Sequence, residues 1–424
     1  MRATEKSDTR AWVLLPDIKS DPDRREPLSA MGEAVSLAMA LPGLEAAGST
    51  IVPLPKPNPG HLFGKGKLEE LKQLFHDQDI ELVIIDGLVS PVQQRNLEKL
   101  WKVKLLDRTS LILEIFSDRA ATREGVLQVE MAALSYQRTR LVRAWTHLER
   151  QRGGLGFVGG PGETQIEADR RAIDQQLVRL RRQLSKVVKT RSLHRAARAK
   201  VPFPVVALVG YTNAGKSTLF NRLTGAGVMA KDMLFATLDP TMRSVKLGPG
   251  FEVIFSDTVG FISDLPTELV AAFRATLEEV LTAGIILHVR DISHAASEEQ
   301  AGDVDQIIAN LGVSEATPIF QLWNKIDLLP EEDVAATAAR ADRQDDVFAI
   351  SALSGDGIEQ VLDTIATALN AATQSDEIVL DHTDGKRRAW LYAQGVVIEE
   401  QTRDTDSVLS LSWTSKQKTQ FAAL

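Results

Sequence analysis

The chain has 424 residues and a net charge of −8; 44% of the residues are hydrophobic and none is cysteine. This length and hydrophobic content predict about two to four domains with sizeable cores, and the lack of cysteine excludes disulfides, thiolate metal sites and cysteine nucleophiles, as fits a reducing cytoplasm. Because the sequence has no apolar leader and no apolar run of about 18 residues, we expect neither export nor a membrane span.

Residues 1–118 alternate short β-like runs with helix-like segments, which predicts a small α/β domain. The expected strands are WVLLP, STIVPLP, ELVIID and VKLLD, and the expected helices cover 28–47, 65–77, 91–101 and 109–117. The phrase GKGK at 64–67 is Gly-rich and basic, and backbone N–H groups at such a strand-to-helix junction can meet an anion. A plain helix N-terminus is the simpler explanation, and an ATP site is the alternative.

Residues 119–200 have the pattern of long helices. Apolar residues recur at steps of three and four from Leu127 to Leu148 and from Ile173 to Val187, which predicts an antiparallel helical hairpin with a buried apolar seam. A seam closed within one chain needs no second copy, so we expect a monomer. The turn at 153–162 holds six glycines, one proline and Phe157. It is either a flexible tip or a loop that orders on RNA, where Phe157 can stack on a base.

The hairpin also carries an unusual charge. Between residues 137 and 200 sixteen Lys and Arg stand against five acidic residues, a net charge of +11 that leaves −19 for the rest of the chain. A solvated helix face is the ordinary explanation of a charge run. In an acidic protein, however, a single basic limb favours contact with a polyanion, and we expect nucleic acid.

Residues 203–372 carry the chemistry. The strand-like run PVVALV leads into Gly210 to Ser217, which have the G-x-x-x-x-G-K-[ST] pattern of a phosphate-binding loop followed by a helix. The backbone of such a loop wraps phosphate, Lys216 bridges the outer phosphates, and the Ser217 hydroxyl binds Mg²⁺.

Two further elements predict a magnesium and γ-phosphate site. Asp257 ends the run FEVIFSD and is expected to hold Mg²⁺ through water, while the Gly260 N–H meets the γ-phosphate. The phrase LFATLDPT offers Thr237, whose hydroxyl reaches Mg²⁺ only when a γ-phosphate is present, so 230–243 is the candidate switch. The expected metal ligands are Ser217, Thr237 and Asp257.

The next motifs predict guanine as the base. Asn324 to Asp327 follow a strand-like run, and a carboxylate at Asp327 can accept both the N1–H and the N2 amino hydrogens of guanine, whereas adenine has an acceptor at N1. The backbone of Ser351 to Leu353 can contact the guanine O6. These elements predict GTP and GDP as ligands.

The phrase DTVGFI raises a question about catalysis. Ras-like GTPases carry a water-orienting glutamine directly after the glycine, and this chain has Phe261 there. We therefore expect slow intrinsic hydrolysis that a bound partner accelerates by ordering the switch segments and the water. Residues 376–424 follow with short alternating runs, which predict a small α+β appendage; they lack the GxxG loop of a KH domain.

These motifs resemble a known family. GYTNAGKST, FATLDPT, DTVGFI and NKID resemble the Obg/HflX group of translation-factor-related P-loop GTPases, and QQRNLEKLW, DRTSLILEIF and GGLGFVGGPGETQIEADRR are similar to the HflX family in particular. The resemblance covers residues 50–372. It implies a cytoplasmic GTPase that binds the large ribosomal subunit and its RNA and helps to separate subunits or rescue ribosomes, with the Gly-rich tip reaching toward the peptidyl transferase region.

The resemblance also bears on Asn213. In similar GTPases that lack the glutamine, an Asn at this position can ligate K⁺, which supplies positive charge near the transferring phosphate. A hydrogen bond that stabilises the loop is the alternative role. The expected catalytic residues are thus Lys216, Thr237, Gly260 and Asn213. The expected nucleotide contacts are Gly210, Tyr211, Thr212, Asn213, Ala214, Gly215, Lys216, Ser217, Phe235, Ala236, Thr237, Leu238, Asp239, Asp257, Thr258, Val259, Gly260, Asn324, Lys325, Ile326, Asp327, Ser351, Ala352 and Leu353.

The expected fold class is α/β: a P-loop GTPase domain with a mostly parallel sheet and helices on both faces, preceded by the small α/β domain and its hairpin and followed by the small appendage. The leading function is GTP hydrolysis that times association with the large ribosomal subunit. The alternative is a GTP-gated RNA-binding or ribosome-assembly factor whose hydrolysis is incidental. A tRNA-modification GTPase is disfavoured because the chain has no cysteine and no tetrahydrofolate-type domain pattern.

Overall fold

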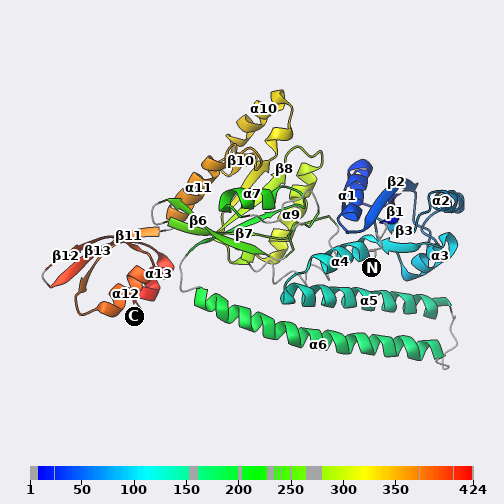
Figure 1. Cartoon of the computed structure of the whole chain (residues 1–424), viewed down its shortest axis with the longest axis horizontal. Helices are drawn as coiled ribbons and strands as arrows, with labels where there is room; N and C mark the ends of the chain where they lie inside the picture. Colours follow the sequence, from blue (N-terminus) through cyan, green and yellow to red (C-terminus); the bar gives the residue numbers. More distant parts are fainter. Residues whose placement is uncertain are drawn as a thin grey trace, which may run out of the picture.

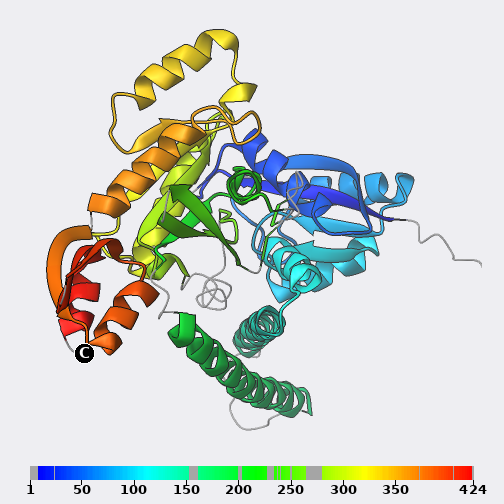
Figure 2. The same ribbon diagram turned by 60° about the vertical axis from the view of Figure 1, so that its left-hand side comes forward.

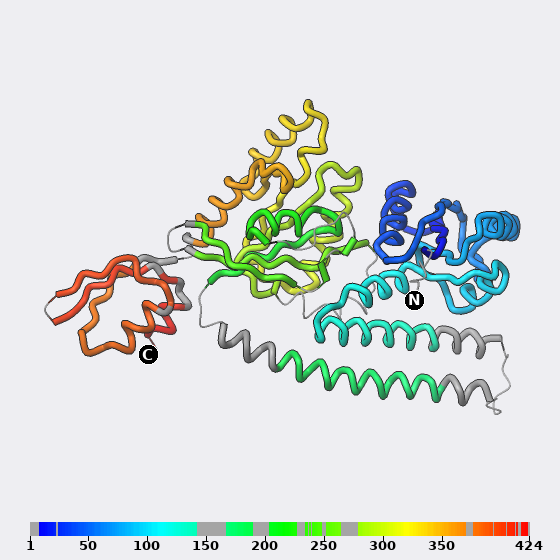
Figure 3. Tube along the Cα trace, viewed as in Figure 1, coloured from blue at the N-terminus to red at the C-terminus, as the bar shows by residue number. Residues whose placement is uncertain are grey.

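The structure is a computed structural model that describes residues 8–22, 24–151, 161–198, 203–226, 234–235, 237–238, 240–248, 251–263, 279–371, 373–403 and 405–422. An N-terminal domain lies at one side, a larger sheet at the centre and a small C-terminal domain at the other side (Figure 1). Two long helices run beneath the first two parts, as the trace in Figure 3 also shows.

The N-terminal domain has one parallel sheet of four strands in the order β2-β1-β3-β4. The strands are β1 (Thr9–Ile18), β2 (Leu44–Leu54), β3 (Leu82–Ile85) and β4 (Lys104–Asp107), and the helices are α1 (Pro27–Met39), α2 (Lys65–Asp77), α3 (Pro91–Trp101) and α4 (Arg108–Arg119). Strand β3 is buried throughout, as a strand covered on both faces must be.

One expected helix of this domain is wrong at its end. The helix expected over 28–47 stops at Met39, and Leu44 already belongs to β2. Pro42 and Gly43 lie between them, and Gly43 has a φ of 78°, in the left-handed region that favours glycine. A proline followed by a left-handed residue cannot continue a helix, so the chain turns there.

The helical hairpin consists of α5 (Arg123–Gln151) and α6 (Pro161–Arg198), which run side by side in opposite directions (Figures 1 and 2). Leu127, Leu177 and Leu180 are buried, and Arg138 pairs with Asp174 across the helices at 3.0 Å. Phe157 and most of the Gly-rich turn lie outside the described residues.

Among the residues that the structure describes, the central domain has a six-stranded sheet in the order β10-β9-β8-β5-β7-β6, in which β6 runs antiparallel to β7 and the other neighbouring strands are parallel. The strands are β5 (Val205–Gly210), β6 (Thr241–Gly248), β7 (Phe251–Asp257), β8 (Ile285–Asp291), β9 (Ile319–Asn324) and β10 (Val347–Ala349), and the helices are α7 (Lys216–Thr224), α9 (Ser297–Leu311), α10 (Glu331–Ala341) and α11 (Ile358–Ala371). This mostly parallel, helix-covered sheet confirms the expected fold class.

The C-terminal domain pairs an antiparallel sheet with two helices, as expected. Its strands β11 (Thr373–Asp381), β13 (Asp406–Thr414) and β12 (Val397–Thr402) lie in that order, and its helices are α12 (Gly385–Ala393) and α13 (Ser415–Ala422). Leu391, Leu409, Leu411 and Trp413 form its core. No helix in the described ranges is long and apolar enough to cross a membrane.

The N-terminal and central domains share one apolar core. Its buried members include Leu37 and Phe116 of the first domain and Phe235 and Phe261 of the second. Phe116 on α4 meets Phe235 edge-on, with ring centroids 4.5 Å apart and planes 74° apart. This shared core brings α1 and α4 against the phosphate-loop side of the central domain.

Candidate functional site

The phosphate loop joins the end of β5 to the start of α7, and two of its glycines are sterically required. Gly210 has a φ of 149°, and a Cβ there would lie 2.2 Å from the carbonyl oxygen of Val289. Gly215 has a φ of 96°, and a Cβ there would lie 2.2 Å from the Asn324 amide nitrogen. No side chain fits at either position, so the loop is formed by backbone alone at these points.

Lys216 lies at the start of α7 and is 6% exposed. Its ammonium donates to the carbonyl oxygen of Tyr211 at 2.7 Å. Burial lowers the pKa of Lys216 to about 8, against the opposing effect of the Asp257 carboxylate. Because Asp257 only partly offsets the effect of burial, the Lys216 ammonium is suited to pair with a phosphate.

The three expected magnesium ligands lie together. The Ser217 hydroxyl donates to Asp257 Oδ2 at 2.7 Å, Thr237 donates to the same oxygen at 2.9 Å, and the two hydroxyls are 2.9 Å apart. Asp257 is fully buried, and burial raises its pKa despite these hydrogen bonds. Its second oxygen, Oδ1, is buried without a hydrogen-bond partner among the described residues. A buried, unpartnered carboxylate oxygen beside two hydroxyls fits a hard divalent cation.

Part of the expected switch packs against the N-terminal domain. Phe235 has a φ of 57° and is 2% exposed, and Leu238 is also buried in the shared core. Ala236 and Asp239 lie outside the described residues. The packing of Phe235 on Phe116 therefore links the segment that carries Thr237 to α4.

The segment after β7 lies directly against the phosphate loop. Thr258 donates to the Leu208 carbonyl at 2.6 Å, and Val259 is buried. A Cβ on Gly260 would lie 2.8 Å from Thr212 Cγ2 and 3.0 Å from Lys216 Nζ. Only glycine allows the backbone to come this close to Lys216.

Phe261 is 3% exposed and belongs to the shared apolar core. Its backbone pairs with the phosphate loop: its N–H donates to Gly210 at 3.1 Å, and its carbonyl accepts from the Thr212 N–H at 2.7 Å. An apolar ring packed in this core has no group that can orient a water. The structure therefore offers no replacement for a glutamine at this position.

The candidate base-binding residues are tied to the phosphate loop through Asn324. Its amide nitrogen donates to the Ala214 carbonyl at 2.7 Å, and its amide oxygen accepts from the Ala352 N–H at 2.8 Å. Asp327 is exposed, as a carboxylate that receives a base must be. Lys325 has a φ of 68° and pairs with Asp291 at 2.7 Å, while Ile326 and Ser351 are buried and Leu353 is exposed.

The remaining loop residues have distinct surroundings. Asn213 is exposed with a φ of 61°, Ala214 is buried, and the buried Thr212 hydroxyl has no partner among the described residues.

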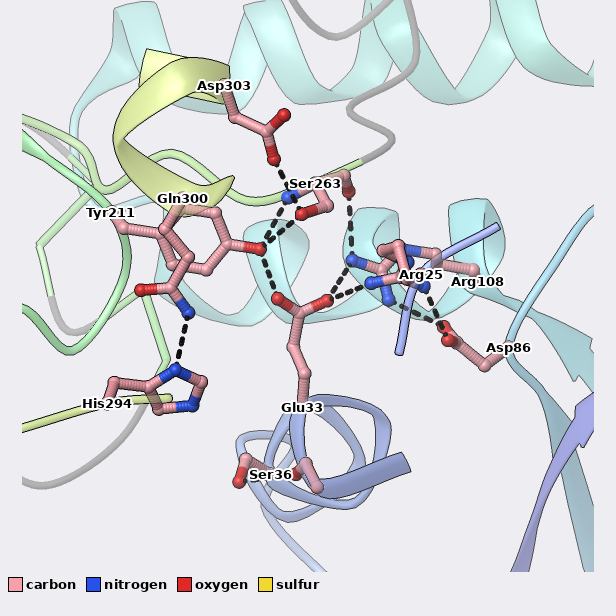
Figure 4. Close-up of polar contacts among 11 residues, drawn as sticks. Arg25, Glu33, Ser36, Asp86, Arg108, Tyr211, Ser263, His294, Gln300 and Asp303 are labelled. Carbon is pink, nitrogen blue, oxygen red and sulfur yellow. Dashed lines mark hydrogen bonds and ion pairs between the residues drawn. The ribbon is translucent and has the colours of Figure 1, made fainter. Parts of the chain in front are cut away.

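A polar network that the sequence did not predict lies at the boundary of the two domains (Figure 4). It consists of Arg25, Glu33, Asp86, Arg108, Tyr211 and Ser263. Asp86 directly follows β3 and Arg108 directly follows β4. Because the carboxyl ends of parallel strands meet at one sheet edge, the phrases ELVIID and KLLDR could have indicated that these charges lie together.

The chain matches four family descriptions in succession. These are "GTP-binding GTPase N-terminal" over 29–117, "GTP-binding GTPase Middle Region" over 119–198, "50S ribosome-binding GTPase" over 205–325 and "HflX C-terminal domain" over 336–422.

Similar proteins carry the same family name. The chain is 45% identical over 399 residues to "GTPase HflX" of Magnetococcus marinus, covering 94% of this chain and 91% of that protein. It is 42% identical over 355 residues to "GTPase HflX" of Escherichia coli, covering 84% and 82%. A solved GTP-binding protein of Sulfolobus solfataricus in complex with GDP is 23% identical, with a TM-score of 0.45, and the match covers 85% of this chain and 98% of that one. The chain is a GTP-binding, GTP-hydrolysing enzyme and belongs to the HflX family.

Proposed function

We propose that this protein is a nucleotide-controlled switch that binds the large ribosomal subunit in its GTP state and leaves it after hydrolysis. The observation that carries this proposal is the convergence of Ser217, Thr237 and Asp257. It links the phosphate loop, the switch segment and the end of β7 at one point. A change from GTP to GDP at that point can therefore be transmitted to the switch.

The chain's own groups suit phosphate binding and transfer. Lys216 is proposed to bridge the β- and γ-phosphates, since its buried ammonium lies beside Gly260, whose N–H is proposed to contact the γ-phosphate. Ser217, Thr237 and Asp257 would hold Mg²⁺, with Asp257 Oδ1 as the unpartnered acceptor. When bound there, the ion would supply positive charge that offsets the negative charge of the phosphates.

Base recognition is proposed for Asp327, with Asn324 holding the surrounding loops in place. Asn324 joins the phosphate loop to the Ser351–Leu353 loop by two hydrogen bonds. These bonds fix the position of the base-binding loops relative to the phosphate loop, so the base and the phosphates of one nucleotide can be bound together. The arrangement supports guanine because a carboxylate accepts hydrogen bonds and cannot donate one.

Hydrolysis is proposed to be slow in the free protein and faster on the ribosome. The buried Phe261 ring supplies no group for the water. We propose that a bound partner orders the switch and the attacking water, which Phe261 cannot do. K⁺ held near Asn213 is proposed to add positive charge near the transferring phosphate. Asn213 is exposed and in the left-handed region, so its side chain is accessible to an ion.

The ribosomal role is supported by the match of 205–325 to the description "50S ribosome-binding GTPase". It is also supported by the exposed basic residues of α6, which include Arg179, Arg181 and Arg182. Such residues suit the phosphate backbone of ribosomal RNA. From this role we propose that the protein acts in the cytoplasm, as a monomer, and helps to separate ribosomal subunits or to rescue ribosomes. We also propose that its domains cover residues 1–118, 119–200, 203–372 and 376–424.

Sedimentation with purified ribosomal subunits tests the proposal. The protein is mixed with large or small subunits in GDP, in a non-hydrolysable GTP analogue, or without nucleotide. We expect it to sediment with the large subunit only in the analogue. Equal sedimentation in all three conditions would contradict a nucleotide-controlled switch.

The second candidate is an RNA-binding protein whose hydrolysis is incidental, and the basic face of α6 favours it. Replacing Arg179 and Arg182 with alanine is expected to weaken binding in either case. A matched double variant, Arg343→Ala with Lys386→Ala, removes the same charge from exposed positions elsewhere. Binding of free RNA that is independent of GTP and lost only in the α6 variant would support this second candidate over the first.

A further inference from the structure

The side chain of Tyr211 leaves the phosphate loop and crosses to the N-terminal domain (Figure 4). Its hydroxyl donates to the Glu33 carboxylate on α1 and accepts from the backbone N–H of Ser263 at 2.7 Å. The Ser263 hydroxyl also lies 2.7 Å from the Tyr211 hydroxyl and donates to Asp303 on α9 at 2.7 Å. One phenol group thus joins α1, the phosphate loop and the segment after Gly260.

The N-terminal domain holds Ser263 from a second side. Arg108, the first residue of α4, donates to the Ser263 carbonyl oxygen at 2.9 Å. The Ser263 N–H donates to Tyr211, and the Ser263 carbonyl accepts from Arg108. Two residues earlier, both the N–H and the carbonyl of Phe261 are hydrogen-bonded to the phosphate loop. The backbone from Gly260 to Ser263 is therefore held between the phosphate loop and the N-terminal domain.

Charge pairing makes this contact stiff. Arg108 is 4% exposed and donates to Asp86 at 2.6 Å and to Glu33 at 2.5 Å. Arg25 donates to the same two carboxylates at 2.9 and 2.7 Å, so two guanidinium groups alternate with two carboxylates. Burial alone would raise the pKa of Glu33, but Arg108, Tyr211 and Arg25 hold it below its ordinary value. Removing any one of the four charged side chains would leave a buried charge uncompensated, so the network resists disruption.

We propose that Glu33 and Arg108 are positioning residues for GTP: acting through Tyr211 and Ser263, they hold Gly260 at the place where its N–H meets the γ-phosphate. The state of the N-terminal domain is thereby coupled to the part of the nucleotide that distinguishes GTP from GDP. A partner that moves α1 away from Tyr211 would release Ser263 and weaken the γ-phosphate contact. This inference rests on the proposed role of Gly260.

The coupling predicts a selective effect on nucleotide affinity. Tyr211→Phe removes only the hydroxyl and keeps the ring in the shared core. We expect the affinity for a non-hydrolysable GTP analogue to fall about tenfold, because a hydrogen bond to a charged carboxylate no longer fixes the segment. The affinity for GDP should fall less than this, because the Tyr211 backbone in the phosphate loop is unchanged and the Ser263 contacts lie on the γ-phosphate side. A role in folding alone would change both affinities together.

Tyr136→Phe is the matched control. The Tyr136 hydroxyl donates to the Asp107 carboxylate and accepts from Arg140. Asp107 precedes Arg108 in the chain, so this hydroxyl lies near the same network but does not contact Ser263. Its loss should leave the ratio of the two affinities unchanged. Glu33→Gln should lower the ratio as Tyr211→Phe does, and the loss in the double variant should be smaller than the sum of the two single losses, because both variants weaken the same Tyr211–Glu33 contact.

An unchanged affinity ratio in Tyr211→Phe, with Gly260→Ala still weakening analogue binding, overturns the coupling and leaves the role of Gly260 intact. An unchanged analogue affinity in Gly260→Ala overturns both the role and the coupling. Equal losses in Tyr211→Phe and Tyr136→Phe also overturn the coupling. All these measurements use nucleotide without ribosomes, so failure of the sedimentation experiment does not affect them.

Discussion

Replacing Phe261 with glutamine restores the residue type that Ras-like GTPases carry, yet we expect it not to restore fast hydrolysis. Phe261 is 3% exposed and packs in the core shared by the two domains. Its backbone is fixed by the phosphate loop at both its N–H and its carbonyl. A glutamine there would have to enter the same apolar space or break the packing around it.

The expected cost follows from that burial. Truncating a buried phenylalanine to alanine costs about 3–5 kcal/mol, the one methylene that glutamine has beyond alanine returns about 0.8 kcal/mol, and an unpaired buried amide adds about 1–3 kcal/mol. We therefore expect Phe261→Gln to lower the free energy of unfolding by about 3–7 kcal/mol. Phe261→Leu keeps the site apolar and should cost about 1–2 kcal/mol.

Denaturant unfolding of the two variants and single-turnover GTP hydrolysis test this reasoning. We expect the glutamine variant to be the less stable and to hydrolyse GTP within about threefold of the parent rate, since its amide does not reach the nucleotide. A glutamine variant of parental stability with hydrolysis raised about tenfold or more would refute it. That result would mean that side chain 261 faces the γ-phosphate when GTP is bound.

Three further predictions concern the nucleotide site. Asp327→Asn should lower GTP affinity by about 100-fold or more and favour xanthine nucleotides, because two hydrogen bonds to a charged acceptor are lost. Hydrolysis should be faster in KCl than in NaCl, and Asn213→Ala should remove the difference. Burial lowers the pKa of Lys216 to about 8, with Asp257 opposing, so its charged form is lost above that pH. If phosphate binding needs that charge, GTP affinity should fall by up to about tenfold per pH unit from about pH 8 to 9.

A single result would contradict each of these predictions. Unchanged base preference in Asp327→Asn would undo the base assignment, and equal rates in the two salts would exclude a role for K⁺. Equal GTP affinity at about pH 7 and 9 would mean that Lys216 keeps its proton in the free protein.

Local chemistry explains why much of the central domain could be predicted. The phosphate loop follows β5, Asp257 ends β7 and Asn324 ends β9; these three strands run parallel, and their carboxyl ends meet at one edge of the sheet. The motifs and the order of these strands are therefore enough to predict that Ser217 and Asp257 lie together. The hairpin was also predictable, because its apolar steps continue over many turns.

Contacts between the domains could not be predicted in this way. Nothing in the local sequence around Glu33 indicates that it meets Tyr211, 178 positions later. Phe116 and Phe235 look like ordinary core residues of separate domains, yet they pack on each other. The helix expected over 28–47 failed for a different reason, since apolar periodicity masked the stop at Pro42 and Gly43.

We propose that this enzyme hydrolyses GTP under the control of the large ribosomal subunit. The most direct test is the rate of GTP turnover by the purified protein alone, with purified small subunits and with purified large subunits. We predict a slow rate alone, no change with small subunits, and an acceleration of about tenfold or more with large subunits. A rate that large subunits leave unchanged would contradict the account.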